Sequence, residues 1–479
     1  MRNKSLDIIA ALILLTACSP KDGSKVSSQS IPIVKTALQD TASVYYADYK
    51  TYPEEISALP IGVFDSGTGG LTVLESLLKA DCFNNTTGAE GSDGIPDFAS
   101  EHFTYLADQA NMPYGNYASA GKLDFFRELV VKDALFLTKI PNRSKIVVIA
   151  CNTATAYGLN DVRDLLSKGI PAVKVIGVIE AGTRASMDMI GPEENAAIGV
   201  LATVGTISSG GYQKAIASAS AERGYKGKID IVCQPGLGFA EAVDMESDFA
   251  DMKATAVRDN YRGPSIGNDS LSIDTKLLDR YKFNFAGNAV LYQKERGNYS
   301  NIQLNSAANY ARLHLVNLIE RHRLQNGDLP LRNIILGCTH YPFLLDTLKK
   351  VVDELRQYEK NGVRLYEKVL PEDMEFIDPS VYTAKEVYAK LREQGILSAS
   401  PASDRLNAYI SIPASGSDAK NLDKDGNFTY DFKYGREAGK EDQSVDIVPF
   451  SIKNINPYNL QRIRERLPQT WSLIEKEIK

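Results

Sequence analysis

The sequence has no excess of basic residues. Its 54 Lys and Arg stand against 60 Asp and Glu, for a formal net charge of −6. A protein that binds nucleic acid normally shows a basic face, so this balance argues against that class. The composition is not that of a fibrous or wholly disordered chain, and no fixed-period repeat of the solenoid kind is present. The 479 residues, 43% of them hydrophobic, are enough for more than one domain around a substantial core.

The apolar run at the N terminus is too short to span a bilayer, which needs about 20 apolar residues. It covers Ile8 to Ala17, follows Arg2 and Lys4, and ends in Leu15-Thr16-Ala17-Cys18. This order is typical of an export signal, and its last four residues resemble the bacterial lipobox, whose cysteine is lipidated. We predict a signal peptide at 1–18, lipidation at Cys18 and an exported protein anchored to a bacterial membrane, at its periplasmic or cell-surface face. A buried N-terminal helix with a chance cysteine is the alternative.

Cysteines are few and widely spaced, unlike the dense disulfide frameworks of small secreted domains. The five are Cys18, Cys82, Cys151, Cys233 and Cys338. If Cys18 carries lipid, four remain, and free thiols in an exported protein call for another role.

A parallel sheet is predicted from residue 60 onward, after a tether at 19–60 that begins with a flexible Ser/Lys-rich stretch. Short apolar runs recur, each followed by a polar turn and an amphipathic segment, which is the pattern of an α/β fold. The predicted strands are Ile61–Phe64, Ile146–Ala150, Val175–Ile179, Ala197–Leu201, Ile229–Val232 and Ile334–Leu336.

Three polar or glycine-rich stretches read as insertions in this frame, at about 82–100, 246–300 and 413–445. The last contains Asn421-x-Asp423-x-Asp425-Gly426, which partly resembles a calcium loop. Its twelfth position is Phe432 instead of Glu, so a coordinating carboxylate is missing. An Asp-Gly hairpin turn explains the segment better.

Four predicted strand ends carry chemically distinctive residues, and ligands of α/β sheets bind at these ends. They are Asp65-Ser66-Gly67-Thr68-Gly69-Gly70, Cys151-Asn152-Thr153, Cys338-Thr339-His340, and the hydroxyls of Thr203, Thr206 and Ser209. The glycine-rich turn by itself fits a tight structural turn as well as an anion site, and it is not the dinucleotide fingerprint. A cysteine at a helix N terminus has a lowered pKa, in the range of about 3.5–7.5. A single cysteine at such a position is more often a small buried hydrophobic residue, but two such cysteines favour a functional role.

Together these motifs resemble those of glutamate racemase, in the aspartate/glutamate racemase family. The matching segments follow the family's order: Asp65-Ser66-Gly67-Thr68-Gly69-Gly70, Pro113-Tyr114-Gly115, Cys151-Asn152-Thr153, Thr203 with Thr206, and Cys338-Thr339-His340-Tyr341-Pro342. Glu241 stands eight residues after Cys233, where the family has an acidic residue near its second cysteine. The resemblance covers about 61–395, and it resumes at Ala408–Ile412 and Tyr458–Glu475 as the family's last strand and helix.

The resemblance implies racemisation of an amino acid, L-glutamate first, without a cofactor or metal. One group removes the α-proton on one face while another supplies a proton on the opposite face. By resemblance Cys151 and Cys338 form this pair, Asp65 assists Cys151, and His340 with Glu241 assists Cys338. The substrate-binding residues implied are Ser66, Pro113, Tyr114, Gly115, Asn152, Thr153, Thr203, Thr206 and Thr339.

The fold implied is α/β, with two parallel-sheet domains facing each other across the active-site cleft. The first is expected at 61–164, the second at 165–344, and residues 345–479 return to the first. Because a substrate must lie between the two sulfurs, much farther apart than the roughly 2.05 Å of a disulfide, we predict that Cys151 and Cys338 stay reduced.

The predicted lipobox departs from the family, whose members normally act in the cytoplasm to supply D-glutamate for peptidoglycan of the cell wall. A racemase for aspartate or another small acid is therefore an open alternative. So is a non-catalytic lipoprotein that binds amino acids through the same cleft. The expected partners are a small amino acid and the membrane, with no nucleic acid, and a homodimer is left open.

Overall fold

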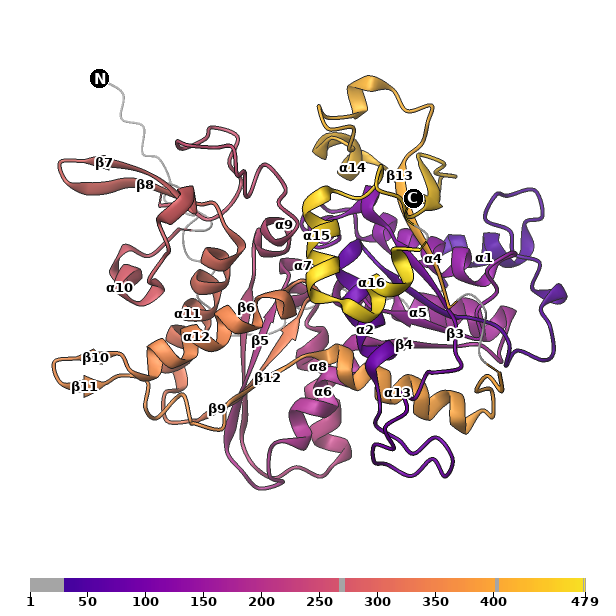
Figure 1. Ribbon diagram of the computed structural model, residues 1–479, viewed down its shortest axis with the longest axis horizontal. Coiled ribbons are helices and arrows are strands. Elements are labelled where there is room, and N and C mark those ends of the chain that lie inside the picture. The colour runs from indigo at the N-terminus through magenta and orange to yellow at the C-terminus, as the bar shows by residue number, and fades with distance from the viewer. Residues whose placement is uncertain (1–29, 267–271, 401–404, 477, 479) are drawn as a thin grey trace, which may run out of the picture.

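The computed structural model describes residues 30–266, 272–400, 405–476 and 478, which form two α/β halves, each around its own sheet (Figure 1). The predicted signal peptide and Cys18 lie outside these residues. Within the described ranges, no helix has the length and hydropathy needed to cross a bilayer.

The first sheet has six strands in the order β14-β13-β2-β1-β3-β4. The parallel strands are β1 (Ile61–Asp65), β2 (Phe103–Ala107), β3 (Ile146–Ile149), β4 (Lys174–Gly177) and β13 (Leu406–Pro413), and β14 (Val445–Pro449) pairs antiparallel with β13 at the edge. Successive side chains alternate between the two faces, so Val63 enters one core and Phe64 the other.

Helices cover both faces of this sheet, and its strands are therefore apolar on both sides. On the face of Val63 lie α2 (Leu71–Lys79), α13 (Pro379–Glu393), α15 (Pro457–Arg466) and α16 (Pro468–Ile474). On the face of Phe64 lie α1 (Pro32–Gln39), α4 (Leu123–Thr138) and α5 (Asn152–Gly169).

The second sheet is wholly parallel, in the order β12-β9-β5-β6. Its strands are β5 (Ala196–Ala202), β6 (Ile229–Pro235), β9 (Leu331–Gly337) and β12 (Glu375–Ile377). One face packs against α9 (Phe239–Val243), α11 (Ala307–Asn326) and α12 (Leu345–Arg356), and the other against α6 (Val178–Asp188), α7 (Val204–Ser209) and α8 (Gly211–Glu222). The fold class is thus α/β with two sheet-based halves, as predicted.

All six predicted strands are strands, although Val178 and Ile179 begin α6 instead of extending β4. Among the strands of the two sheets, β2, β12 and β14 were not predicted. The sequence positions at which the chain passes from one half to the other also differ from the expected boundaries at 164 and 344. β4 pairs with β3 in the first sheet, so the second half starts after residue 177, and β12 pairs with β9, so it runs to residue 377. A three-residue strand such as β12 is too short to give a periodic signal.

The segment predicted as a tether is folded over its described part, which corrects that prediction. α1 packs on α5 and α4 and buries Ile33, Val34 and Ala37 in the core of the first half. The physical reason is its amphipathic pattern, with apolar residues along one side of the helix.

The three predicted insertions lie outside the two sheets. Residues 246–300 contain α10 (Leu278–Tyr281) and most of an antiparallel hairpin, β7 (Val290–Glu295) with β8 (Asn298–Leu304). Residues 413–445 connect β13 to β14 and contain α14 (Tyr430–Gly435). Their partial calcium motif forms a tight turn: the Asp423 carboxylate accepts from the N–H groups of Asp425 and Asn427, and Gly426 has a φ of +83°.

The remaining elements are short. They are α3 (Asn116–Ser119), the hairpin of β10 (Glu359–Lys360) and β11 (Val363–Arg364), and 3-10 helices at Tyr49–Thr51, Thr68–Gly70, Gln109–Asn111, Thr275–Leu277, Ala286–Asn288, Tyr341–Leu344 and Ala419–Asn421. The predicted last helix at Tyr458–Glu475 is two helices, α15 and α16, because Pro468 begins a new one.

Candidate active site

A small cavity of about 40 Å³ lies where the carboxyl ends of the two sheets face each other. Twelve of the fourteen predicted catalytic and substrate-binding residues line it: Ser66, Pro113, Tyr114, Gly115, Cys151, Asn152, Thr153, Thr203, Glu241, Cys338, Thr339 and His340. The other two, Asp65 and Thr206, contact lining residues from behind. The structure therefore brings residues as far apart in sequence as Asp65 and Thr339, 274 positions, into one site.

Cys151 enters the cavity from the first half, at the N-cap of α5 directly after β3. Its pKa is raised well above the ordinary value, first by burial and then by the charge of Asp65. The prediction of a lowered pKa is therefore wrong for this thiol. A hydrogen bond from the helix N terminus acts in the predicted direction, but burial outweighs it.

Asp65 is fully buried behind Cys151 and links the two halves. Its Oδ2 accepts from the backbone N–H of Gly70 at 2.6 Å and from Oγ1 of Thr339, in the second half, at 3.2 Å. Burial raises its pKa above the ordinary value, and the charge of His340 opposes the shift. A carboxylate here disfavours the thiolate form of Cys151.

Cys338 enters from the second half after β9 and lies beside His340, with 3.6 Å between its Sγ and His340 Nδ1. The other ring nitrogen, Nε2, lies 3.1 Å from Oδ2 of Asp244. Burial alone lowers the pKa of His340, but the charge and hydrogen bond of Asp244 outweigh it and raise this pKa well above the ordinary value. The two thiols therefore have different neighbours, the carboxyl group of Asp65 for Cys151 and the imidazole of His340 for Cys338.

Glu241 lines the cavity, yet the ring of His340 is paired with Asp244, one helical turn later at the end of α9. The expectation that His340 with Glu241 assists Cys338 stays a prediction, and the structure adds Asp244 as the carboxylate within hydrogen-bond distance of the ring. Burial raises the pKa of Glu241, and the charge of His340 opposes that shift. Asp244 was not singled out from the sequence, although a second acid one turn after Glu241 was a usable signal.

Three threonine hydroxyls from both halves meet at one end of the cavity. The Oγ1 atoms of Thr153, Thr203 and Thr206 lie 2.9 to 3.0 Å from one another, and Thr203 also caps α7. Ser209, by contrast, donates to the carbonyl of Thr206 within α7 and is absent from the cavity lining. Hydroxyls beside the N terminus of the 18-residue helix α5 suit a carboxylate ligand.

The glycine-rich turn after β1 serves close packing. A Cβ on Gly69 would lie 2.5 Å from Cε1 of His340, and one on Gly70 would lie 2.4 Å from Cβ of Asp65. Ser66 is the residue of this turn that lines the cavity. The turn thus lets the first half approach His340 of the second.

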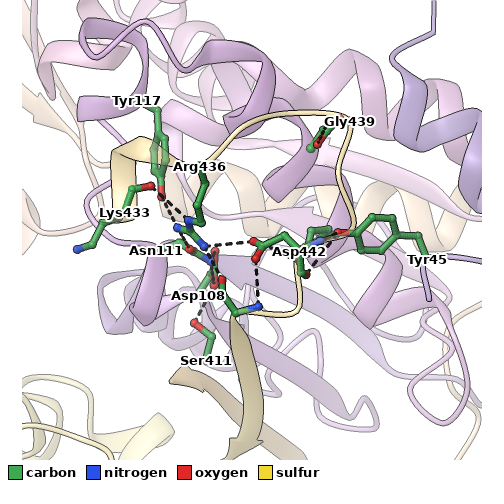
Figure 2. Close-up of polar contacts among 12 residues, drawn as sticks. Tyr45, Asp108, Asn111, Tyr117, Ser411, Lys433, Arg436, Gly439 and Asp442 are labelled. Carbon is green, nitrogen blue, oxygen red and sulfur yellow. Dashed lines mark hydrogen bonds and ion pairs between the residues drawn. The ribbon is translucent and has the colours of Figure 1, made fainter. Parts of the chain in front are cut away.

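The cavity wall at 112–115 is held from behind by the insertion at 413–445. Figure 2 shows Arg436 of this insertion pointing toward Asn111 and Tyr117 on one side and Asp442 on the other. The hydroxyl of Tyr434 donates to the carbonyl of Pro113 at 2.9 Å.

The hydroxyl of Tyr114 points away from the cavity. It bonds to Asp108 at 2.5 Å and to Asp133 at 2.7 Å, so the ring and backbone of Tyr114 form the wall. Its expected role in substrate binding stays a prediction, with the ring and backbone as the parts that face the cavity. Among the described residues, no group of three or more His, Cys, Asp or Glu side chains is placed to hold a metal ion.

Comparison with known proteins identifies the relatives of this chain, although no family model matches it. It is 28% identical over 294 residues to the glutamate racemase of Oceanobacillus iheyensis, covering 61% of this chain and 72% of the relative. It is 24% identical over 349 residues to that of Stutzerimonas stutzeri, covering 73% and 88%. The chain is related in sequence to glutamate racemases.

Higher identity is confined to a shorter segment. The chain is 38% identical to the glutamate racemase of Enterococcus faecalis over 158 residues, 33% of this chain and 46% of the relative. A solved glutamate racemase from Bacillus anthracis aligns over 74% of this chain and 87% of its own, with 23% identity and a TM-score of 0.42.

Proposed function

We propose that this chain is a cofactor-independent racemase that interconverts L- and D-glutamate, with Cys151 and Cys338 as its two proton-transfer groups. The main support is that two buried thiols, one from each half, line the same small cavity. A protein that only bound amino acids would need the polar groups of this cavity but would have no use for two opposed thiols. The relatedness to glutamate racemases points to the same substrate.

The proposed reaction begins with a Cys338 thiolate and a Cys151 thiol. The thiolate removes the α-proton of the bound enantiomer, and the thiol donates its proton to the opposite face of the α-carbon. The product is the other enantiomer, with Cys338 now a thiol and Cys151 a thiolate. No net proton is consumed, and the reverse reaction exchanges the two roles. The raised pKa of Cys151 favours it as the proton donor of the resting pair.

The substrate carboxylates are proposed to lie against the helix starts and hydroxyls of the cavity. The N terminus of α5 offers the backbone N–H groups of Asn152 and Thr153 to an anion. The Oδ1 of Asn152 accepts from Tyr212 at 2.6 Å, which fixes the orientation of the amide. Backbone donors held in this way stabilise charge that develops on the α-carboxylate as the proton leaves.

The test is to incubate soluble protein starting after Cys18 with each enantiomer of glutamate, and then of aspartate, and to follow the products by chiral chromatography. We expect L- and D-glutamate to interconvert, and Cys151→Ala and Cys338→Ala each to abolish this. Binding of glutamate measured by calorimetry should survive both changes. If glutamate binds to a folded, reduced protein but is never inverted, the chain is a binding protein; inversion of aspartate alone would reassign the substrate.

We also propose that the protein is exported and held at a bacterial membrane by lipid on Cys18. The support is the order of charge, apolar run and cysteine in the first eighteen residues. In membrane fractionation we expect Cys18→Ala to leave the membrane fraction, with Cys82→Ala as the matched control that stays there. Equal partition of both variants contradicts a Cys18 anchor.

A further inference from the structure

A buried series of hydrogen-bonded side chains links Arg462 through Asp244 to His340. Oδ2 of Asp244 lies 3.1 Å from His340 Nε2, and Oδ1 accepts from Nη2 of Arg462 at 2.7 Å. Both oxygens of a carboxylate that is 4% exposed are therefore paired. This series continues through the imidazole of His340 to Cys338, so four side chains in a row connect Arg462 to the thiol.

The hydrogen bond at Nε2 fixes which proton the imidazole can offer to Cys338. Because a carboxylate only accepts hydrogen bonds, Nε2 must carry a proton whether His340 is neutral or charged. When His340 is charged, Nδ1 also carries a proton and faces the sulfur of Cys338. The pairing with Asp244 thus sets the ring orientation and favours the form that stabilises a thiolate.

Arg462 holds Asp244 in place from the other half of the molecule. It comes from α15, which packs on the first sheet, whereas Asp244 ends α9 in the second half. Its Nη1 donates to the carbonyl of Val243 at 2.6 Å, and its guanidinium lies 4.6 Å from the ring centre of Phe343. A guanidinium anchored on three sides keeps the carboxylate of Asp244 ionised and aimed at the ring.

The charged and titratable groups that face His340 come from four segments. Cys338 lies on the same loop, Glu241 on α9 and Asp244 at its C-cap, Asp65 at the end of β1, and Arg462 on α15 behind Asp244. Of the carboxylates, Asp244 is the one within hydrogen-bond distance of the ring. Its pKa is shifted far below the ordinary value because His340 and Arg462 outweigh the effect of burial.

We propose that Asp244, fixed by Arg462, is the residue that positions His340 and stabilises its imidazolium form, in place of Glu241. Resting on the proposed function, the consequence is that this imidazolium faces Cys338 and stabilises the thiolate that Cys338 forms when it acts as the base. The proton moves from Cys338 Sγ to His340 Nδ1, giving a thiolate and an imidazolium with no change in total charge. Glu241 is then left free to contact the substrate from the cavity wall.

The direct test is NMR of the histidine rings in protein with 15N-labelled histidine, without substrate. The chain has four histidines, and burial lowers the pKa of the other three, His102, His314 and His322. At about pH 8, above the ordinary imidazole pKa of about 6.5, we expect one ring protonated on both nitrogens. That signal should vanish in His340→Gln. If all four rings are neutral at this pH in the unsubstituted protein, the proposal is overturned.

Substitutions then identify the carboxylate responsible. Asp244→Asn should return His340 to the neutral form at about pH 8, while the matched change Glu241→Gln should leave it charged. Asp244→Glu should restore part of the charged population, and Arg462→Lys should retain more of it than Arg462→Gln. The opposite pattern, with loss of charge in Glu241→Gln alone, overturns the proposal. If Asp244→Asn does not fold, the Glu241→Gln and Arg462 variants still decide between the two acids.

A second readout separates positioning from general damage. In a working racemase, Asp244→Asn should lower kcat by roughly 10²-fold, with a smaller change in KM and a shifted pH profile. Asp244→Glu should recover part of kcat. An unchanged kcat and pH profile contradicts the positioning role. If neither enantiomer of any amino acid is inverted, the proposed function fails, yet the ring signals still show whether Asp244 controls the charge of His340.

Discussion

At the scale of single residues, the two thiols differ because different groups lie behind them. Cys151 is buried against Asp65, and Cys338 against His340. Burial and a nearby negative charge both disfavour a thiolate, whereas a nearby positive charge favours it. The proposed mechanism holds one thiol and one thiolate at rest and needs such an asymmetry, which the neighbours Asp65 and His340 would supply.

This asymmetry predicts how Cys151 reacts with an alkylating reagent. Because only the thiolate reacts, Cys151 should label slowly at neutral pH and faster as pH rises toward its raised pKa. Asp65→Asn removes a negative charge, so it should lower that pKa and speed the labelling of Cys151 at a given pH. Peptide mapping by mass spectrometry measures the rates. Cys82, part-exposed and distant in sequence, is the internal control and should be unaffected. Slower labelling of Cys151 in Asp65→Asn contradicts this account.

The prediction that Cys151 and Cys338 stay reduced remains a prediction. All four cysteines among the described residues are free thiols. Non-reduced peptide maps of active, exported protein would decide it, since a Cys151–Cys338 bridge would leave no room for a substrate between the sulfurs.

At the scale of elements, the insertion at 413–445 acts as a support for the cavity wall. Arg436 of this insertion is enclosed by polar partners on both sides (Figure 2). The backbone N–H of Gly439 donates to the Glu128 carboxylate at 2.9 Å. These contacts lie behind residues 112–115, which face the cavity. Loosening the insertion should therefore disturb substrate binding more than proton transfer.

The predicted effect is clearest for Arg436→Met, which leaves the Asp442 carboxylate with one cationic partner fewer. Loss of these part-buried hydrogen bonds and of the ion pair should cost about 1–3 kcal/mol of stability, and we expect KM for glutamate to rise severalfold with a smaller change in kcat. Lys420→Met, which removes an exposed ion pair with Asp418 in the same insertion, is the matched control and should alter neither quantity. Thermal unfolding and steady-state kinetics measure both. A fall in kcat with unchanged KM and stability contradicts a supporting role.

The sequence predicted the elements whose patterns are strong and local. The six predicted strands are apolar runs bounded by polar turns, and Cys151 and Cys338 follow two of them. The pairing of Asp244 with His340 could not be predicted, because it depends on how the end of α9 lies against a loop 96 residues away. The burial of Cys151 was missed for a similar reason: position at a helix N terminus is visible in sequence, but the degree of desolvation is not. The packing of α1 was hidden by the flexible composition before it.

At the scale of the whole molecule, three polar contacts between the halves lie at the cavity. Asp65 bonds to Thr339, Thr153 to Thr203, and Arg462 to Asp244. The relative position of the halves therefore determines whether the two thiols can reach opposite faces of one α-carbon.

The two large insertions also meet each other, one from each half. The guanidinium of Arg262 lies 4.2 Å from the ring centre of Tyr430, and burial raises the pKa of Glu246 to about 8 while the charge of Lys433 opposes that shift. Through these contacts residues 246–300 and 413–445 tie the halves together beyond the cavity itself. Neither feature was predictable from composition, which marks both segments only as polar.

The central claim, that two thiols act on opposite faces, is tested most directly by α-proton exchange in D₂O, followed by proton NMR with chiral analysis. A thiol that exchanges with solvent delivers deuterium to the new face, whereas unreacted substrate keeps its original proton. We therefore predict that, early in the reaction of L-glutamate, the D-glutamate formed is deuterated and the remaining L-glutamate is not. When the reaction starts from D-glutamate, the L-glutamate formed should be deuterated and the remaining D-glutamate should not. Deuterium entering both enantiomers equally from the start would show a single base, and no exchange at all in a folded, reduced protein would contradict racemisation altogether.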